Sequence, residues 1–223
     1  MPERPQQISP FFSRIFPWLV IAILGIFTYA KFFVLPYTGF IHNSSGGEVR
    51  IVFVENPSNQ TLIAGDHLLK VGEVTWEEFS NDLYLTLFEK NIPGDIVPIV
   101  VERDQQILEI PWMLPGRNQA EFLDRFNSVL IMAYLFWVSG FVTILFVRPI
   151  DKRWRTMTAF FFMTALWLAA GSLSGWHIWG SAIFLRFVIW LCVPLYLRLH
   201  WMIPHPLGKL PSGLVPQLDE NVW

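Results

Sequence analysis

Histidine is the residue type in this chain best suited to acid–base or metal chemistry near neutral pH, and the five histidines are scattered. They stand at positions His42, His67, His177, His200 and His205. No two of them form the HExxH pattern, and the one cysteine, Cys192, belongs to no Cys/His spacing typical of zinc sites. We therefore expect no metal site, no cofactor and no disulfide framework.

A second candidate for chemistry is the run Gly171-Ser172-Leu173-Ser174-Gly175, which is loosely similar to the serine motif of intramembrane proteases. Its register differs from Gly-x-Ser-Gly, and a hydrolase would need Ser174 within hydrogen-bond reach of His177 or His200. The alternative is a role in close helix contacts, which small residues allow. The glycines concerned are Gly140, Gly171 and Gly175. No P-loop or GxGxxG motif is present, so we expect no catalytic residue.

Two cations fall inside apolar runs. Arg186 lies eight residues into the run 178–197, which is about 12 Å deep at the rise of an α-helix. Charges at such depth usually face the interior of a helical bundle, so we predict Arg186 to be a bundle-interior charge. The alternatives are that Arg186 snorkels to the surface or pairs with a helix of another chain. Lys31, near the end of its run, is expected to snorkel.

The composition explains where these residues must sit. Of the 223 residues, 53% are hydrophobic and 15% are charged, whereas soluble domains carry about 25% charged residues. Four runs reach the roughly 20 apolar residues that a membrane span needs. They are residues 17–36, 128–147, 156–175 and 178–197. The predicted fold class is therefore a membrane α-helical protein with four transmembrane helices, the first of them a retained signal anchor.

The charges predict the orientation of these spans. The loop 148–155 contains one acidic residue and four basic residues, and short basic loops stay in the cytoplasm. Residues 1–16 and the tail 198–223 then lie on the cytoplasmic side, and residues 37–127 lie outside. Residues 37–127 hold six Lys/Arg and 14 Asp/Glu, a net charge of −8, while the remainder carries +6. Trp176 and Trp179 are expected at the outer interface, as part of an aromatic belt.

Residues 37–127 are long enough for one small α+β domain. Runs rich in Val, Ile and Phe predict strands at 48–55, 67–71, 96–103 and 107–112, with turn residues between them. Thr75 and Glu78 fit a capping box at the start of a helix. Phe79, Leu83 and Leu87 recur at helical spacing, which predicts an amphipathic helix that ends near Asn91.

Two stretches of this segment resemble a PDZ domain. Tyr37-Thr38-Gly39-Phe40 is similar to the carboxylate-binding loop of that family, and Gly65-Asp66-His67-Leu68-Leu69-Lys70-Val71 is similar to its Gly-Asp-x-Ile-Leu-x-Val motif. The resemblance implies a PDZ-like extracytoplasmic domain whose loop N–H groups bind a peptide carboxylate beside a strand edge. The implied ligand-binding residues are Thr38, Gly39, Phe40, Ile41 and Leu83. The alternative is that the membrane-proximal linker or another subunit fills this groove.

The stretch LRLHWMIPHP at 197–206 resembles the His-x-x-x-x-Pro-x-Pro segment that closes a span in sensor regions of bacterial histidine kinases related to the ComP quorum sensor. His200, Pro204 and Pro206 match that pattern. The resemblance implies a bacterial cytoplasmic membrane protein with a PDZ-like domain between its first and second spans. It also implies coupling to a kinase domain in cis or in trans. The 223 residues contain neither a phospho-accepting His box nor ATP-binding boxes, so we expect no enzymatic activity in this chain.

These features lead to the hypothesis of a sensor or receptor input module of a signal-transduction system. Its expected partners are the lipid bilayer, a peptide or envelope protein ligand, a cytoplasmic kinase-type effector and a second copy in a homodimer, with no nucleic acid. The alternative is a membrane adaptor or scaffold that presents substrates to an envelope protease. A neighbouring kinase gene would favour the sensor, and a neighbouring protease gene would favour the adaptor.

Overall fold

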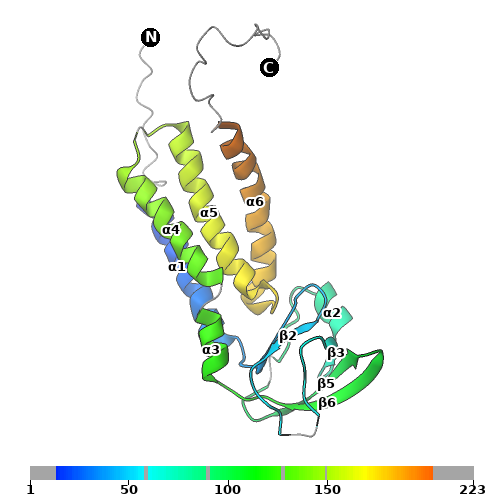
Figure 1. Cartoon of the computed structure of the whole chain (residues 1–223). Helices are drawn as coiled ribbons and strands as arrows, with labels where there is room; N and C mark the ends of the chain where they lie inside the picture. Colours follow the sequence, from blue (N-terminus) through cyan, green and yellow to red (C-terminus); the bar gives the residue numbers. More distant parts are fainter. Residues whose placement is uncertain (1–13, 58–59, 89–90, 127–128, 149, 203–223) are drawn as a thin grey trace, which may run out of the picture.

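The computed structural model describes residues 14–57, 60–88, 91–126, 129–148 and 150–202. Long helices lie side by side, and a small domain with strands, here called the inserted domain (residues 37–117), lies at one end of them (Figure 1). The chain enters the inserted domain from the first long helix and leaves it into the second. The first and last described residues both lie at the opposite end of the bundle (Figure 1).

Four helices in the described part of the chain are long and apolar enough to cross a membrane, which confirms the predicted helical, multi-pass class. The helical elements are α1 (Phe16–Tyr29) with the π-helical turn η2 (Ala30–Val34), α3 (Gln119–Phe126), α4 (Val129–Phe146), α5 (Lys152–Ser174), and the 3-10 turn η3 (Ile178–Gly180) before α6 (Ser181–Met202). The helix α5 begins four residues earlier than the predicted span because Asp151 caps it, accepting a hydrogen bond from Trp154 N–H at 2.8 Å.

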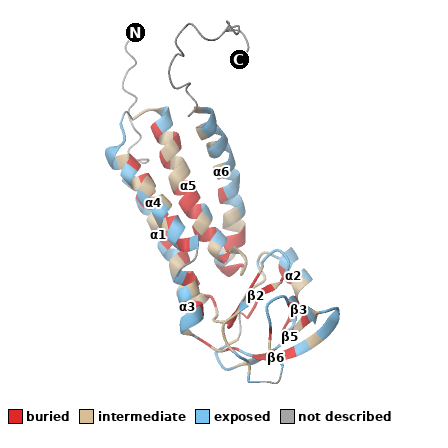
Figure 2. Cartoon of the chain, viewed as in Figure 1, coloured by how far each residue is buried: buried red, intermediate tan, exposed pale blue. Residues whose placement is uncertain are grey.

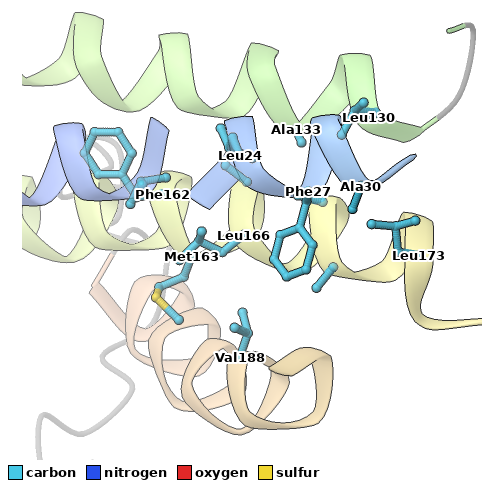
Figure 3. Packing of buried hydrophobic residues seen from close by; sticks show 14 of the residues in the cluster. Leu24, Phe27, Ala30, Leu130, Ala133, Phe162, Met163, Leu166, Leu173 and Val188 are labelled. Atoms are coloured by element: carbon cyan, nitrogen blue, oxygen red, sulfur yellow. The ribbon is translucent and has the colours of Figure 1, made fainter. Parts of the chain in front are cut away.

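Apolar side chains from all four long helices form the core of the bundle (Figure 3). Phe27 of α1, Ala133 of α4, Leu166 of α5 and Val188 of α6 meet there. Buried residues are frequent along α5, which packs against α1, α4 and α6, whereas α6 is mostly exposed or intermediate (Figure 2). The exposed apolar residues of these helices are those that a bilayer would cover.

The glycines differ in the closeness of their contacts. At Gly140 in α4, an added Cβ would lie 2.9 Å from the Phe162 ring of α5, so the predicted close helix contact is confirmed there. At Gly171, the nearest atom belongs to Leu185 at the ordinary distance of 3.9 Å. The close packing of α4 against α5 therefore requires glycine at position 140.

The inserted domain contains two antiparallel sheets, which agrees with the predicted small domain between the first two spans. One pairs β1 (Phe40–His42) with β2 (Val49–Val52), and the other has the order β4-β3-β5-β6. Its strands are β3 (His67–Val71), β4 (Val74–Thr75), β5 (Ile96–Arg103) and β6 (Gln106–Met113). The two-residue turn between β5 and β6 has positive φ at both residues, the geometry that favours a tight hairpin. The predicted strands are confirmed, and β3 and β5 have the predicted bounds.

The helix α2 (Trp76–Asn81) begins as predicted. Thr75 Oγ1 accepts a hydrogen bond from Glu78 N–H at 3.2 Å, and Glu78 Oε2 accepts one from Thr75 N–H at 2.9 Å. These two bonds confirm the capping box. The Glu78 carboxylate accepts hydrogen bonds from Thr75 N–H and, at 2.8 Å, from Thr75 Oγ1, and these lower the pKa of the Glu78 carboxyl because they stabilise its charged form.

The predicted end of this helix near Asn91 is wrong, because α2 ends at Asn81. Asp82 Oδ1 accepts a hydrogen bond from Tyr84 N–H at 2.9 Å, which is a local turn that competes with helix continuation. Phe88 also has a φ of 62°, which no α-helix contains. Leu83 consequently lies in the irregular segment after α2.

Candidate functional site

The loop predicted to bind a carboxylate is buried and hydrogen-bonded within the chain. Gly39 has a φ of +80°, and an added Cβ would clash with neighbouring side chains, so the position requires glycine. Thr38 Oγ1 donates to Phe40 O at 2.8 Å, and Trp112 Nε1 donates to Thr38 O at 2.7 Å. The Gly39 N–H donates to Glu121 Oε2 at 3.0 Å. The carboxylate that this loop holds is thus the chain's own Glu121 side chain.

Two aromatic residues from the turn between α5 and η3, here called the Trp176–His177 pair, pack between β1 and α2. The ring of Trp176 lies 4.4 Å from the ring of His42 in β1. The ring of His177 stacks on Phe79 of α2 at 4.3 Å, and His177 Nδ1 is 3.0 Å from Leu85 O. The place where the sequence predicts a ligand, between the strand after the loop and the next helix, therefore holds this pair.

The backbone beside the Trp176–His177 pair is strained. His177 and Trp179 have φ values of 56° and 50°, which cost on the order of 1–2 kcal/mol each for residues with a Cβ. Gly175 lies against the inserted domain, since an added Cβ would be 2.8 Å from Ser44 Cβ. Gly175 thus allows a close approach to the loop after β1 rather than the predicted contact between helices. The contacts with the inserted domain hold the strained turn in place.

His42, at the centre of this contact, is buried and in aromatic surroundings. Its ring lies 5.2 Å from that of Trp76. Burial, together with a smaller effect of the nearby His177, lowers the pKa of His42 to about 4. The Asn43 backbone lies close enough to oppose this shift, but neither ring nitrogen of His42 reaches hydrogen-bonding geometry with any described residue. His42 is therefore neutral at neutral pH.

A buried ion pair joins the loop to the end of the first span. Arg125 Nη2 lies 2.6 Å from Glu121 Oε1, and both side chains are about 5% exposed or less. The same guanidinium donates to three backbone carbonyls at the end of η2, those of Lys31 at 2.7 Å, Leu35 at 2.9 Å and Pro36 at 2.6 Å. These bonds satisfy carbonyls that a helix end leaves free. The Glu121 carboxylate of α3 thus binds the Gly39 loop of the inserted domain directly and the end of the first span through Arg125.

A cavity of about 220 Å³ lies at this junction. The residues around it include Lys31, Phe40, Ile41, Glu121, Asp124, Arg125, Ser172 and Trp176. Lys31 is only 6% exposed, so the prediction that it snorkels to solvent is wrong. Two of the predicted ligand-binding residues, Phe40 and Ile41, thus line this cavity together with residues of the spans.

The remaining predicted site residues lie elsewhere. Leu83 is half-buried after α2 and does not line the junction cavity. Arg186 is exposed on the outside of the bundle, where the sequence had predicted an interior charge. This exposed position agrees with the alternative of a snorkelling arginine.

The residues considered for chemistry do not combine into a catalytic or metal site. Ser174 Oγ donates to Gly171 O at 3.0 Å, and His200 Nε2 pairs with the Tyr196 hydroxyl at 2.8 Å. The Ser–His bond of a hydrolase is therefore not formed among the described residues, and these residues contain no His/Cys/Asp/Glu group that could hold a metal. Pro204, His205 and Pro206 of the kinase-like stretch lie outside the described residues.

Sequence reasoning missed Glu121 and Arg125, and it placed Trp176 in an aromatic belt. The available signal for the first two was an acid–base pair at i, i+4 directly before an apolar run. No local signal identifies Trp176, because its contact with His42 joins residues that lie 134 positions apart in the chain.

No family model, curated protein or solved structure matches the chain. The resemblance to PDZ domains and to sensor regions of histidine kinases therefore stays a prediction.

Proposed function

We propose that this chain is the sensory input module of a signal-transduction system in a bacterial cytoplasmic membrane. The PDZ-like inserted domain would bind a peptide or another envelope ligand and pass the change through the spans to a cytoplasmic kinase-type effector, in cis or in trans. The observation that carries the proposal is the packing of the Trp176–His177 pair between β1 and α2. A segment that connects two spans thus lies in the predicted ligand position.

In the proposed mechanism, the ligand replaces internal groups. Its carboxylate would take the Gly39 N–H from Glu121, and its side chains would displace the Trp176–His177 pair. Displacement would relieve the positive φ at His177 and free the turn that joins α5 to η3 and α6. Removing Glu121 from Gly39 would also alter the ion pair that holds the end of η2. Both changes reach transmembrane helices, which is what a sensor needs.

The proposal can be tested by screening a library of peptides with free C-termini against the full chain in lipid nanodiscs. Only molecules in which the Trp176–His177 pair has left the groove can bind a peptide, so the apparent affinity is reduced in proportion to the fraction of such molecules. Trp176→Ala should therefore raise the affinity of selected peptides roughly tenfold. Trp179→Ala is the matched control, since Trp179 belongs to the same turn but is 56% exposed.

A peptide signal that requires a free C-terminal carboxylate and strengthens in Trp176→Ala supports the proposal. If the library yields no binder with the wild-type chain or with Trp176→Ala, while both variants retain their near-UV circular dichroism, the peptide-sensing role is wrong. Binding that strengthens in Trp176→Ala without any response of the spans would instead favour the adaptor.

A further inference from the structure

A second and larger cavity lies where the inserted domain meets the ends of two spans. Its volume is about 540 Å³, within the range of sites that hold small organic ligands. Its lining comes from η2 and the residues after it, from His177 and η3, and from residues 84–88, 91–93 and 114–117 of the inserted domain. Leu35 lines both this cavity and the 220 Å³ junction cavity. The ligand proposed here does not depend on the proposed peptide sensing.

The aromatic side chains around this cavity are exposed and lie at the level where the spans end. Tyr84 is 80% exposed, Phe33 70% and Trp179 56%. Tyr29, on the last turn of α1, stacks between the latter two, with ring centroids 5.2 Å from Phe33 and 6.2 Å from Trp179. Tyr and Trp gather in this way at the headgroup level of a bilayer. Membrane lipids are therefore the molecules present at highest local concentration beside the cavity.

The charge of the lining is positive within an acidic domain. Arg117 is the lining residue with a formal charge, and no Asp or Glu is among the described residues that line this cavity. Its guanidinium lies 4.6 Å from the centroid of the Phe122 ring, and neither ion pair found among the described residues involves it. Residues 37–127, which include Arg117, carry a net charge of −8. An anionic group is thus the complement to Arg117, the one residue with a formal charge among the described residues of the lining.

The lining also contains a buried polar atom that needs a partner. Thr86 Oγ1 is inaccessible to solvent and has no hydrogen-bond partner among the described residues. A buried hydroxyl without a partner costs free energy, so most such groups bind a ligand, water or protein atom. An ester carbonyl or phosphate oxygen of a lipid would supply an acceptor once the Thr86 hydroxyl rotates toward the cavity.

We propose that this cavity binds an anionic phospholipid of the surrounding bilayer, with the phosphate at Arg117, an ester group near Thr86 and an acyl chain along the exposed aromatic residues. A bound lipid would then connect the inserted domain with the ends of the first and fourth spans. The site selects phosphatidylglycerol over phosphatidylcholine because only the former carries net negative charge.

The test is native mass spectrometry of the full chain released from detergent, titrated with phosphatidylglycerol or phosphatidylcholine. We expect one phosphatidylglycerol to be retained at concentrations at which phosphatidylcholine is not. Arg117→Glu should lower phosphatidylglycerol occupancy at least about fivefold, the effect expected for one basic residue near anionic lipid. Arg50→Glu, at an exposed arginine of the same domain outside the cavity, should leave it unchanged.

A second variant tests the cavity itself by filling it. Thr86→Trp should remove retention of the lipid while the near-UV circular dichroism of the chain is preserved. If Thr86→Trp does not fold, Arg117→Gln provides the test, because it removes the positive charge at an exposed position. This variant should bind phosphatidylglycerol and phosphatidylcholine equally. Equal occupancy by the two lipids in the wild-type chain, or phosphatidylglycerol retention unchanged in Arg117→Glu, would overturn the proposal.

Discussion

At the scale of single residues, the junction depends on two buried polar side chains of different kinds. His42 is kept neutral by burial and has no hydrogen-bond partner among the described residues, whereas Glu121 is paired and hydrogen-bonded. Acidification therefore protonates His42, whereas mutation of Arg125 removes the partner of Glu121.

The pH dependence of stability follows from the pKa of His42. The folded-state pKa is about 4 and the unfolded value is 6.5, so the unfolded chain takes up the proton first as the pH falls. The contribution of His42 is fully present above about pH 6.5 and is lost progressively down to about pH 4, by at most about 3 kcal/mol. Equilibrium unfolding of the full chain in detergent between pH 7.5 and 4.5 should show this slope.

His42→Phe should reduce the slope in this window, because the protonation site is gone while an aromatic ring remains. His67→Phe, a change at an exposed histidine of β3, should keep the wild-type slope. Equal slopes in the wild-type chain and His42→Phe would contradict the assignment.

The ion pair gives a second prediction at this scale. Arg125→Ala leaves the Glu121 carboxylate buried without its cation and frees three carbonyls at the end of η2. The free energy of unfolding should fall by about 3–5 kcal/mol. Arg50→Ala, at an exposed arginine, should change it by less than about 0.5 kcal/mol. Denaturation of the two variants in the same detergent measures the difference in the free energy of unfolding. Similar decreases in the two variants would contradict a stabilising role of Arg125.

At the residue level, the sequence predicts that the Thr38–Phe40 loop binds the carboxylate of a peptide ligand. In the structure the Gly39 N–H of this loop donates to the chain's own Glu121, 82 residues further along the chain. Such a partner cannot be read from local spacing. The binding of an external ligand at this loop stays a prediction.

At the scale of elements, strands were easier to predict than the end of the short helix. β5 is rich in β-branched residues, β3 is a short apolar run between turn residues, and the bounds of both strands are as predicted. The apolar spacing after Thr75 indicated a long helix, but the turn at Asp82 ends it after six residues. Leu87, the last member of that pattern, is buried in the domain core without being helical. The helical spacing of Phe79 and Leu87 therefore reflects burial in the domain core and not a continuous helix.

The packing of α4 on α5 can be tested at a glycine. Gly140→Ala would place a methyl group 2.9 Å from the Phe162 ring and should lower the free energy of unfolding by about 1–3 kcal/mol. Gly25→Ala in α1 is the matched control, since no atom lies within 4 Å of its added Cβ. The control should be neutral or stabilising by about 0.5–1 kcal/mol, because alanine favours helices. Two variants of equal stability would contradict the close packing.

At the scale of the whole molecule, hydrophobic run length predicted four spans and the charge distribution predicted their orientation. The structure confirms four helices of sufficient length and apolarity and places the inserted domain at one end of them (Figure 1). What faces the cytoplasm follows from the positive-inside rule and stays a prediction. The contact of the α5–η3 turn with the inserted domain could not be predicted, because it depends on how the bundle and the domain meet.

The orientation can be measured with cysteines, since Cys192 is the one native cysteine and is replaceable by alanine. In that background, Ile107→Cys at the exposed β5–β6 end should react with a membrane-impermeant maleimide in intact spheroplasts. Lys152→Cys, at the start of α5, should react only after permeabilisation. The reverse pattern would contradict the predicted orientation.

The central claim is that the Trp176–His177 pair couples the inserted domain to the spans. Spin labels at Phe146→Cys and Trp201→Cys, both exposed near the far ends of α4 and α6, report on the bundle by pulsed electron paramagnetic resonance in nanodiscs. Trp176→Ala should shift the distance between the labels by about 1–2 Å, the size of helix movements in switching proteins. Trp179→Ala should leave the wild-type distance. A Trp176→Ala distance that coincides with the wild-type distance, in a chain that remains folded, would contradict the account.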